Sequence, residues 1–314
     1  MTDLTPAHFP RETDGRGAFV RQVSSFRDTV TADGSSGFPA APGRYHLYVS
    51  HACPWASRAV ITRRLKGLED AISMTVVDPL RDERGWRFTA QDPDPVNGLA
   101  FLREAYLLID PRFDQRATVP VLWDRETNRA VNNESAEIIR MLNDEFDAWA
   151  THPEVDLYPE PLRAEIDALN AWIYEAVNDG VYRCGFAASQ EAYEAAFAEL
   201  FAALDRLDGL LARRRYLTGS QITEADIRLF VTLVRFDAVY VGHFKCNLRR
   251  IADYPQLSGY LRDLHQHPCI GETVDLDHSR RHYYMTHPQL NPSRIVPLGP
   301  ELDLVSPPGR AHLA

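Results

Sequence analysis

The sequence predicts an α/β domain followed by an all-helical domain. Two strand-like runs flank a helical segment between residues 45 and 77, which is the pattern of a βαβ unit with a parallel sheet. Two more strand-like runs and a helix follow between residues 118 and 142. From about residue 162 the apolar residues recur at helical spacing. The length of 314 residues is sufficient for both domains.

The elements of the first domain, placed at residues 41–150, can be justified in order. The strands are short and rich in β-forming residues, whereas the first helix is marked by Pro54 at its start. In chain order we expect a strand at 45–49, a helix at 56–65, a strand at 72–77, an irregular connector with a short helix at 100–108, a strand at 118–124, a partner strand from 130, and a helix at 133–142. This order, β-α-β, connector, β-β-α, is that of a thioredoxin-like domain.

The parts on either side of this domain have different patterns. Residues 1–40 are polar and rich in Gly and Pro, so we expect an extension that wraps the body, anchored by Phe19, Val20 and Phe26. The second domain, placed at 151–314, should be all-helical with an irregular tail from about 271. Its helices are expected at 162–177, 192–211, 223–239 and 254–265, the third opened by a capping box of Thr223 and Asp226.

Composition argues against several classes of function. The net charge of -10 and the scattered basic residues disfavour nucleic acid as a partner. Apolar runs are too short to span a bilayer, and the first residues lack the features of a signal peptide, so we expect a cytoplasmic protein without a membrane partner. The four cysteines are widely spaced, which favours reduced thiols over a disulfide framework.

Cys53 is the leading candidate for a reactive residue. It lies between the strand at 45–49 and the helix at 56–65, so unpaired N–H groups of a helix N-terminus should point at its sulfur and favour the thiolate. The spacing is similar to a Cys-x-x-Cys redox motif, but Ala56 occupies the second position. A mixed disulfide at Cys53 must therefore be resolved by an external thiol, for which glutathione is the obvious cytosolic source. The alternative is a buried structural cysteine beside a proline turn.

Several separated motifs carry a resemblance to a known family over roughly residues 15–300. They are Cys53-Pro-Trp-Ala56, Gly85-Trp86-Arg-Phe88, Thr118-Val-Pro-Val-Leu-Trp-Asp124, Asn132-Asn-Glu-Ser-Ala-Glu-Ile-Ile-Arg140, Asn178-Asp-Gly-Val-Tyr182-Arg-Cys-Gly-Phe186, Arg235-Phe-Asp-Ala-Val-Tyr240 and His282-Tyr283-Tyr-Met-Thr-His287. With these motifs the chain resembles the glutathione transferase superfamily and, more closely, its glutathionyl-hydroquinone reductases, the Xi class. Cys184, two residues from Tyr182, is a visible departure.

Glutathione carries two carboxylates and an ammonium group, so its site needs both donors and an acceptor. Glu134 and Ser135 open a helix, where the hydroxyl and free N–H groups suit a carboxylate and Glu134 suits the ammonium; the alternative is a simple helix cap. The resemblance places Trp86 against a glutathione carboxylate, although core packing is the ordinary fate of a tryptophan. The remaining glutathione-binding candidates are Arg116, Thr118 and Val119. If the bond before Pro120 is cis, it would expose the backbone of Val119, but the sequence leaves the state of that bond open.

The resemblance also gives roles to tyrosines in the second half of the chain. Tyr182 would be the proton donor and acceptor, whereas Tyr240 and Tyr283 would help to activate Cys53. Without the resemblance each would be an ordinary interfacial tyrosine. No metal is expected, because His265, His267 and Cys269 lie at alternate positions of a helix end and cannot all face one ion.

The expected function is glutathione-dependent reduction of glutathionyl-hydroquinones to free hydroquinones, with release of glutathione disulfide. Cys53 forms a mixed disulfide with glutathione, which is a co-substrate, and no bound cofactor is expected. One alternative is an omega-like thiol transferase or dehydroascorbate reductase that uses the same cysteine. A second is a non-catalytic glutathione-transferase-like binding module. A homodimer is the expected assembly.

Overall fold

The computed structural model describes residues 12–313, and the chain divides into two compact units. The thioredoxin-like unit comprises Val23–Asp156 together with Asp277–His287. The helical unit comprises residues 12–22, Leu157–Leu276 and residues 288–313. Residues 1–11 of the expected extension lie outside the described residues.

The thioredoxin-like unit is built on a four-stranded sheet in the order β2-β1-β3-β4. Its strands are β1 (Tyr45–Val49), β2 (Ile72–Val76), β3 (Val121–Asp124) and β4 (Arg129–Asn132). β1 and β2 are parallel, whereas β3 is antiparallel to both β1 and β4. The predicted βαβ unit and its strand pair are therefore confirmed.

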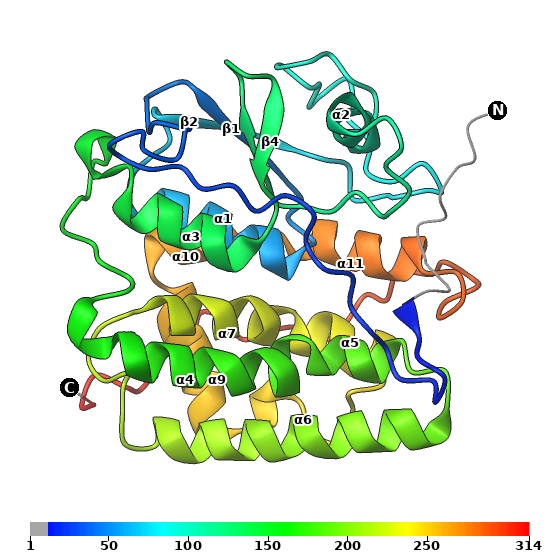
Figure 1. Ribbon diagram of the computed structural model, residues 1–314. Coiled ribbons are helices and arrows are strands. Elements are labelled where there is room, and N and C mark those ends of the chain that lie inside the picture. The colour runs from blue at the N-terminus through cyan, green and yellow to red at the C-terminus, as the bar shows by residue number, and fades with distance from the viewer. Residues whose placement is uncertain (1–11, 314) are drawn as a thin grey trace. The chain divides into compact units, whose positions relative to one another are not determined.

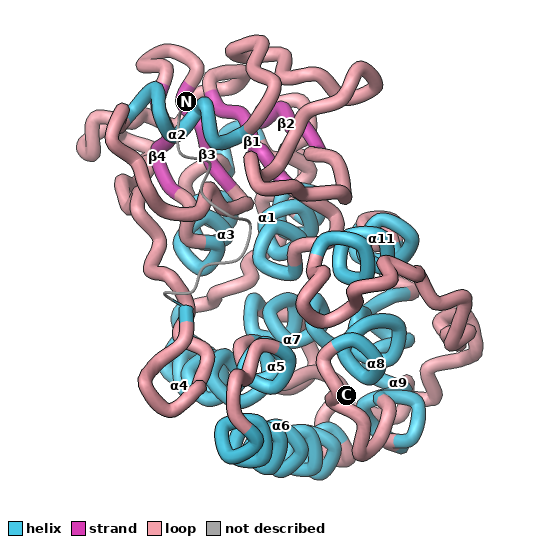
Figure 2. Tube along the Cα trace, turned by 90° about the vertical axis from the view of Figure 1, so that its right-hand side faces the viewer, coloured by secondary structure: helices cyan, strands magenta, loops and turns pink. Residues whose placement is uncertain are grey.

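Helices cover both faces of this sheet. Helix α1 (Pro54–Leu65) and helix α3 (Ser135–Asp144) pack side by side on one face, and α2 (Leu102–Ile109) lies on the other (Figures 1 and 2). A short 3-10 helix, Asp147–Trp149, follows α3. The core between these layers includes the fully buried side chains Tyr45, Leu47, Trp123, Ile138 and Phe146. Helix α2 confirms the short helix expected within the connector.

The helical unit follows the predicted spacing, with two interruptions. Its helices are α4 (Arg163–Ile173), α5 (Gly180–Gly185), α6 (Gln190–Leu211), α7 (Glu224–Arg235), α8 (Val241–His243), α9 (Pro255–His265) and α10 (Pro268–Gly271), with 3-10 turns at Glu160–Leu162 and Ile251–Asp253. The segments expected to be helical at 162–177 and 223–239 each end in a π-helical turn, Tyr174–Asn178 and Phe236–Tyr240. Such turns widen a helix locally and are frequent at functional sites.

The predicted capping box of α7 is present. The Thr223 N–H donates to Asp226 Oδ2 at 2.9 Å, and the fully buried Asp226 carboxylate also accepts the Leu217 N–H and the Tyr260 hydroxyl. One carboxylate thus joins the start of α7 to the loop before it and to α9. The sequence pattern predicted the helix cap. The structure adds that the buried Asp226 carboxylate also connects three segments of the helical unit.

The irregular tail expected from residue 271 is wrong for part of its length. Helix α11 (Leu276–Thr286) lies there, and from Asp277 onward it belongs to the thioredoxin-like unit. Its buried stripe is His278, Ser279, His282, Tyr283 and Thr286. These positions follow helical periodicity, but they are polar or amphipathic, so a search for apolar periodicity does not detect them. Residues 288–313 contain only turns and extended chain.

The described part of the extension is divided between the two units. Phe19 is buried in the helical unit, whereas Phe26 packs against the core of the thioredoxin-like unit and its ring lies 5.2 Å from that of Tyr106. Both anchors are confirmed. Val20 is 51% exposed, so the third expected anchor is wrong. The side chains of neighbouring residues in an extended segment point to opposite sides. The side chain of Phe19 points inward, so that of Val20 points toward solvent.

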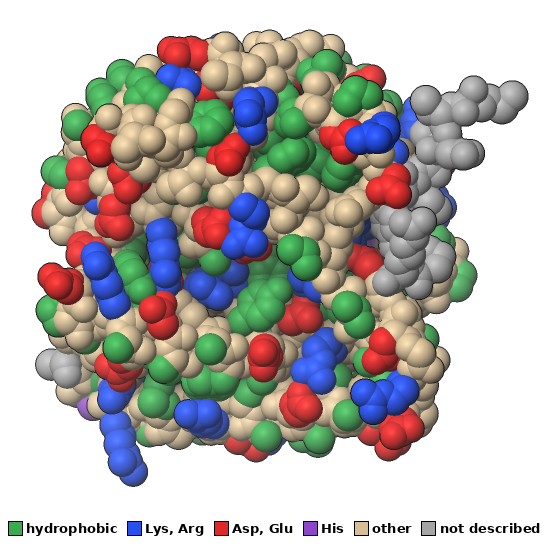
Figure 3. Space-filling view, in the orientation of Figure 1, with side chains coloured by type: hydrophobic (Ala, Val, Ile, Leu, Met, Phe, Trp, Pro, Cys, Tyr) green, Lys and Arg blue, Asp and Glu red, His purple; other side chains and the backbone are tan. Residues whose placement is uncertain are grey.

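The surface has no strongly basic region on the face drawn in Figure 3, where Lys and Arg side chains lie among Asp and Glu. None of the helices formed by residues 12–313 combines the length and the apolar character needed to cross a membrane.

Candidate functional site

Cys53 occupies the N-cap of α1, with Pro54 as the first helical residue. This placement follows from the predicted strand-turn-helix pattern, because the chain leaves β1 through Ser50 and enters the helix at a proline. The half-buried thiol donates a hydrogen bond to the carbonyl oxygen of Val119 at 3.4 Å. The N-terminus of α1 and the segment before β3 therefore meet at this sulfur.

The peptide bond between Val119 and Pro120 is cis, and β3 begins directly after it. The neighbouring Thr118 is held through the hydroxyl of Tyr106, which donates to the Thr118 carbonyl at 2.9 Å and accepts its N–H at 3.2 Å. Burial raises the pKa of Tyr106, so its hydroxyl remains protonated and able to donate. Arg116 is half-buried, and its positive charge acts on Tyr106.

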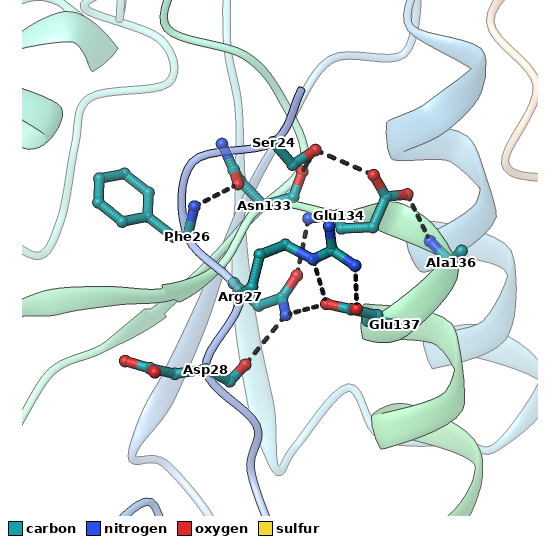
Figure 4. A network of polar contacts seen from close by, with 9 residues as sticks. Ser24, Phe26, Arg27, Asp28, Asn133, Glu134, Ala136 and Glu137 are labelled. Carbon is teal, nitrogen blue, oxygen red and sulfur yellow. Dashed lines mark hydrogen bonds and ion pairs between the residues drawn. The ribbon is translucent and has the colours of Figure 1, made fainter. Parts of the chain in front are cut away.

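Glu134 and Ser135 begin α3, as expected. The Glu134 side chain is the N-cap: one carboxylate oxygen accepts the Ala136 N–H at 3.1 Å, and the other accepts the Ser24 hydroxyl at 2.9 Å (Figure 4). Ser135 is buried, and its Oγ accepts a hydrogen bond from the Arg58 guanidinium at 3.2 Å. Because Arg58 belongs to α1, this bond ties together the N-termini of α1 and α3.

Two donors in this region keep a hydrogen available. The Ser135 hydroxyl hydrogen has no acceptor within the described residues, and neither does the indole N–H of Trp86. The site therefore presents hydrogen-bond donors of the kind that a carboxylate accepts.

The loop before α3 is fixed by the extension (Figure 4). The Phe26 N–H donates to the side chain of Asn133 at 2.9 Å, and Arg27 forms an ion pair with Glu137 on the first turn of α3. Asn132 also donates to Glu137, at 2.8 Å, and to the carbonyl oxygen of Asp28. Residues 24–28 thus hold the end of β4 and the start of α3 as one rigid corner.

Trp86 is buried, with an exposed fraction of 4%. Its ring stacks on His282 of α11 with centroids 4.7 Å apart, and the guanidinium of Arg81 lies 5.3 Å from its centroid. The His282 ring also bonds to the carbonyl oxygen of Pro79 at 2.7 Å. The indole is therefore held in place by the last helix of the chain.

Helix α11 is also bonded to the turn that carries Cys53. His278 makes a hydrogen bond of 3.2 Å with the hydroxyl of Ser50, and Ser279 donates to the carbonyl oxygen of His51 at 3.3 Å. Tyr283 lies on the same buried stripe, with an exposed fraction of 2%, beside His282 and His287. The structure thus brings Tyr283 and Cys53 into the same unit.

Tyr182 and Tyr240 form a second group, in the helical unit. Both side chains are buried, and their ring centroids lie 6.1 Å apart. Tyr240 is the last residue of a π turn and stacks on Phe244, whose ring also lies 5.3 Å from Tyr182. One π turn therefore precedes α5, which carries Tyr182, and the other π turn contains Tyr240 itself.

The other cysteines do not have the features of Cys53. Cys184 and Cys246 are buried in the helical unit, where burial and a hydrogen bond between the two thiols raise the pKa of Cys246. A buried thiol in apolar surroundings is inert as a nucleophile. Cys269 is half-buried in α10, at the second position of a four-residue helix. No group of His, Cys, Asp or Glu among residues 12–313 is arranged to hold a metal ion.

Comparison with known proteins agrees with this geometry. The glutathione S-transferase N-terminal domain family matches residues 52–145, and the corresponding C-terminal domain family matches residues 190–263. A crystal structure of the glutathione S-transferase Xi from Phanerochaete chrysosporium is 50% identical, with a TM-score of 0.90, over 94% of this chain and 96% of that one. This chain belongs to the Xi class of glutathione transferases.

Two similar relatives carry a named activity. The glutathionyl-hydroquinone reductase YqjG from Escherichia coli (strain K12) is 53% identical over 94% of this chain and 92% of its own length. The glutathionyl-hydroquinone reductase PcpF from Sphingobium chlorophenolicum is 52% identical over 90% of each chain. The solved structure of YqjG, which has glutathione bound, covers 91% of this chain and 96% of its own with a TM-score of 0.88.

Several residues of this Xi-class site carried no recognisable signal in the sequence. Ser24 bonds to Glu134 across 110 positions, and His278 bonds to Ser50 across 228. Arg58 lies on the predicted helix 56–65, but its bond to Ser135 depends on how α1 and α3 pack. Arg58 is fully buried in the structure, and the presence of a charged residue in a predicted helix does not by itself indicate such burial.

Proposed function

We propose that this chain reduces glutathionyl-hydroquinones to free hydroquinones, with glutathione as the co-substrate and glutathione disulfide as the second product. The observation that carries the proposal is the setting of Cys53. Its thiol lies at a helix N-terminus, where a thiolate is favoured, and it is the single cysteine of the thioredoxin-like unit. The other three cysteines belong to the helical unit. The enzyme therefore needs an external thiol to complete a cycle.

The cycle has two displacement steps. The Cys53 thiolate attacks the sulfur of the glutathionyl-hydroquinone, and the carbon–sulfur bond breaks with its electron pair on the ring carbon. Tyr182 gives its proton to that carbon, which releases the hydroquinone and leaves Cys53 in a mixed disulfide with glutathione. A second glutathione thiolate attacks the mixed disulfide, releasing glutathione disulfide and regenerating the Cys53 thiolate. The Tyr182 phenolate takes up a proton from water.

The proposed glutathione subsite uses the corner at the start of α3. The γ-glutamyl carboxylate would accept from the N-terminal amides of α3 and from the Ser135 hydroxyl, whose hydrogen is available. The ammonium group would bind Glu134, because each of its carboxylate oxygens retains a lone pair beyond the bonds already described. Trp86 would donate its indole N–H to a glutathione carboxylate. Val119 would pair its backbone with the cysteinyl part of glutathione, and Thr118 and Arg116 complete the subsite.

Tyr240 and Tyr283 are proposed to favour the Cys53 thiolate by donating hydrogen bonds to it. Hydrogen bonding to the charged form of a thiol lowers its pKa. The burial of both rings supports this role, because a buried phenol usually has a hydrogen-bond partner.

Turnover of two substrates side by side tests the proposal. The protein is supplied with glutathione and either glutathionyl-menadiol or hydroxyethyl disulfide. We expect equal amounts of menadiol and glutathione disulfide to form from the first substrate, and Cys53→Ser to abolish both. Turnover of hydroxyethyl disulfide alone would favour the thiol transferase activity instead. Absence of both activities would favour a non-catalytic binding module.

A homodimer in a reducing, cytoplasmic compartment completes the proposal. The cycle consumes reduced glutathione, and closed two-fold dimers are the commonest assembly of soluble oligomers. Sedimentation velocity at micromolar concentration should give the mass of two chains. A monomer at that concentration would contradict the dimer without affecting the assignment of the reaction.

A further inference from the structure

The segment at residues 12–22 is firmly attached to the helical unit. The Gly17 carbonyl accepts the Ala188 N–H at 2.8 Å, and the Ser189 hydroxyl donates to the Arg16 carbonyl at 2.8 Å. Gly17 has a φ of +86°, and a Cβ there would lie 2.9 Å from the Ser189 nitrogen, so only glycine fits this approach. The Phe19 ring lies 5.5 Å from that of Phe186, on the turn after α5. These contacts fix the course of the chain toward Arg21.

Arg21 lies directly over the ring of Tyr182. Its guanidinium carbon is 4.5 Å from the ring centroid, and its Nε donates to the carboxylate of Asp179 at 2.5 Å. The exposed fractions of the Arg21 and Asp179 side chains are 18% and 14%, so solvent screens this pair weakly. The carbonyl of Asp179 also accepts the Tyr182 N–H at 2.9 Å. A single turn of chain therefore carries both Tyr182 and the carboxylate of Asp179, which binds the guanidinium above the Tyr182 ring.

The charges around Arg21 keep it protonated. Burial acts to lower the pKa of Arg21, but the Asp179 carboxylate and the phenol groups of Tyr182 and Tyr174 outweigh it and raise the pKa. This interaction is mutual, because a cation that gains from a nearby phenolate stabilises that phenolate equally. The other titratable groups of this cluster are Tyr174 on the preceding π turn and Tyr240 on the neighbouring one.

We propose that Arg21 is a positioning residue that holds the Tyr182 ring and stabilises the phenolate left when Tyr182 donates its proton. The proposal rests on the proton-donor role proposed above for Tyr182. In that step the O–H bond breaks, the proton goes to the ring carbon of the leaving hydroquinone, and the electron pair stays on the phenolate oxygen. The guanidinium faces the ring that then carries the negative charge. The segment before the thioredoxin-like unit thus contributes to the proton-transfer step.

Substitutions of Arg21 that either remove or keep its positive charge test this role when turnover is measured. Arg21→Gln and Arg21→Met remove the cation, and Arg21→Lys retains it. The two neutral variants should lower kcat for glutathionyl-menadiol roughly 5- to 30-fold, the range that a buried cation–π contact supports, and change KM little. Exchange with hydroxyethyl disulfide should fall about twofold or less, because its thiolate leaving group needs little protonation. Arg21→Lys should retain a large part of the wild-type kcat.

A titration separates failure of this inference from failure of the proposed function. With 3-fluorotyrosine at position 182, ¹⁹F NMR follows ionisation of that phenol without any substrate. The midpoint should rise by about one pH unit or more in the two neutral variants, because the cation favours the ionised form. The alkaline limb of the kcat/KM profile should move to higher pH with it.

Arg183→Gln is the matched control, because Arg183 lies next to Tyr182 on α5 but pairs with Glu199 at the surface. Its titration midpoint should equal that of the wild type. Unchanged midpoints in folded Arg21→Gln and Arg21→Met would overturn the inference, even if the enzyme reduces glutathionyl-menadiol. Shifted midpoints in an enzyme that does not turn over glutathionyl-menadiol would support the charge interaction and refute the proposed reaction.

Discussion

Replacing Tyr182 by phenylalanine removes one hydroxyl and leaves the ring contacts. The ring touches Phe186, Tyr240 and Phe244, and a phenyl group keeps these contacts and the guanidinium of Arg21 above its face. We therefore expect the free energy of unfolding to change by about 1 kcal/mol or less. A loss of activity in Tyr182→Phe would then report on the proton rather than on folding.

The size of that loss follows from the role of the hydroxyl. General acid catalysis contributes about 10²–10⁴-fold, which corresponds to roughly 2.7–5.4 kcal/mol of barrier. The cation 4.5 Å from the ring stabilises the phenolate that proton donation leaves, so we expect a loss in the upper half of this range, about 10³-fold or more.

The assay compares kcat for glutathionyl-menadiol with kcat for hydroxyethyl disulfide in wild type and Tyr182→Phe. The first should fall by the factor given above, whereas the second should change little. Equal losses on both substrates would mean that Tyr182 acts through Cys53 or through the structure. No loss on either substrate would refute the proton-donor role.

Three further predictions concern the nucleophile and two structural contacts. Exposure to glutathione disulfide should add the mass of one glutathione at Cys53, as seen by peptide mass mapping; an adduct on another cysteine instead would contradict the assignment. In a urea titration, Gly185→Ala should destabilise the protein by about 1–3 kcal/mol, because its Cβ would lie 2.1 Å from the Phe244 ring. The control Gly209→Ala, where a Cβ meets nothing within 4 Å, should be neutral or stabilising in the same titration. Equal effects of the two substitutions would show that the Phe244 contact is unimportant. Asp226→Ala should cost roughly 3–5 kcal/mol, because it leaves buried donors without an acceptor, and an unchanged urea midpoint would refute the role of that junction.

Local sequence patterns predicted the parts of the site that depend on neighbours in the chain. The Cys53 turn, the start of α3 at Glu134 and the capping box at Thr223 are each specified within a few residues, and each lies where the pattern placed it. Capping and proline chemistry act over a single helical turn, so a short window of sequence contains the required information.

Contacts between distant segments could not be predicted in this way. The bond between Arg21 and Asp179 joins residues 158 positions apart, and the stack of His282 on Trp86 joins α11 to a loop before α2. The π turns were also missed, because the inserted residue changes the helical register without a local sequence signature. These features depend on which faces meet, and that is decided by the packing of whole elements.

The return of α11 to the thioredoxin-like unit has a consequence for the order in which the chain is made. The strands and the Cys53 turn have all been synthesised by residue 156, but the helix that stacks on Trp86 and bonds to Ser50 comes only after residues 157–276. That interval is 120 residues, or about 6–24 s at ordinary rates of synthesis of roughly 5–20 residues per second. During this time the surface that receives α11 has no cover from it, and helices α4 to α10 of the helical unit can form first. The turn that carries the reactive cysteine therefore gains its bonds to α11 only after that helix has left the ribosome.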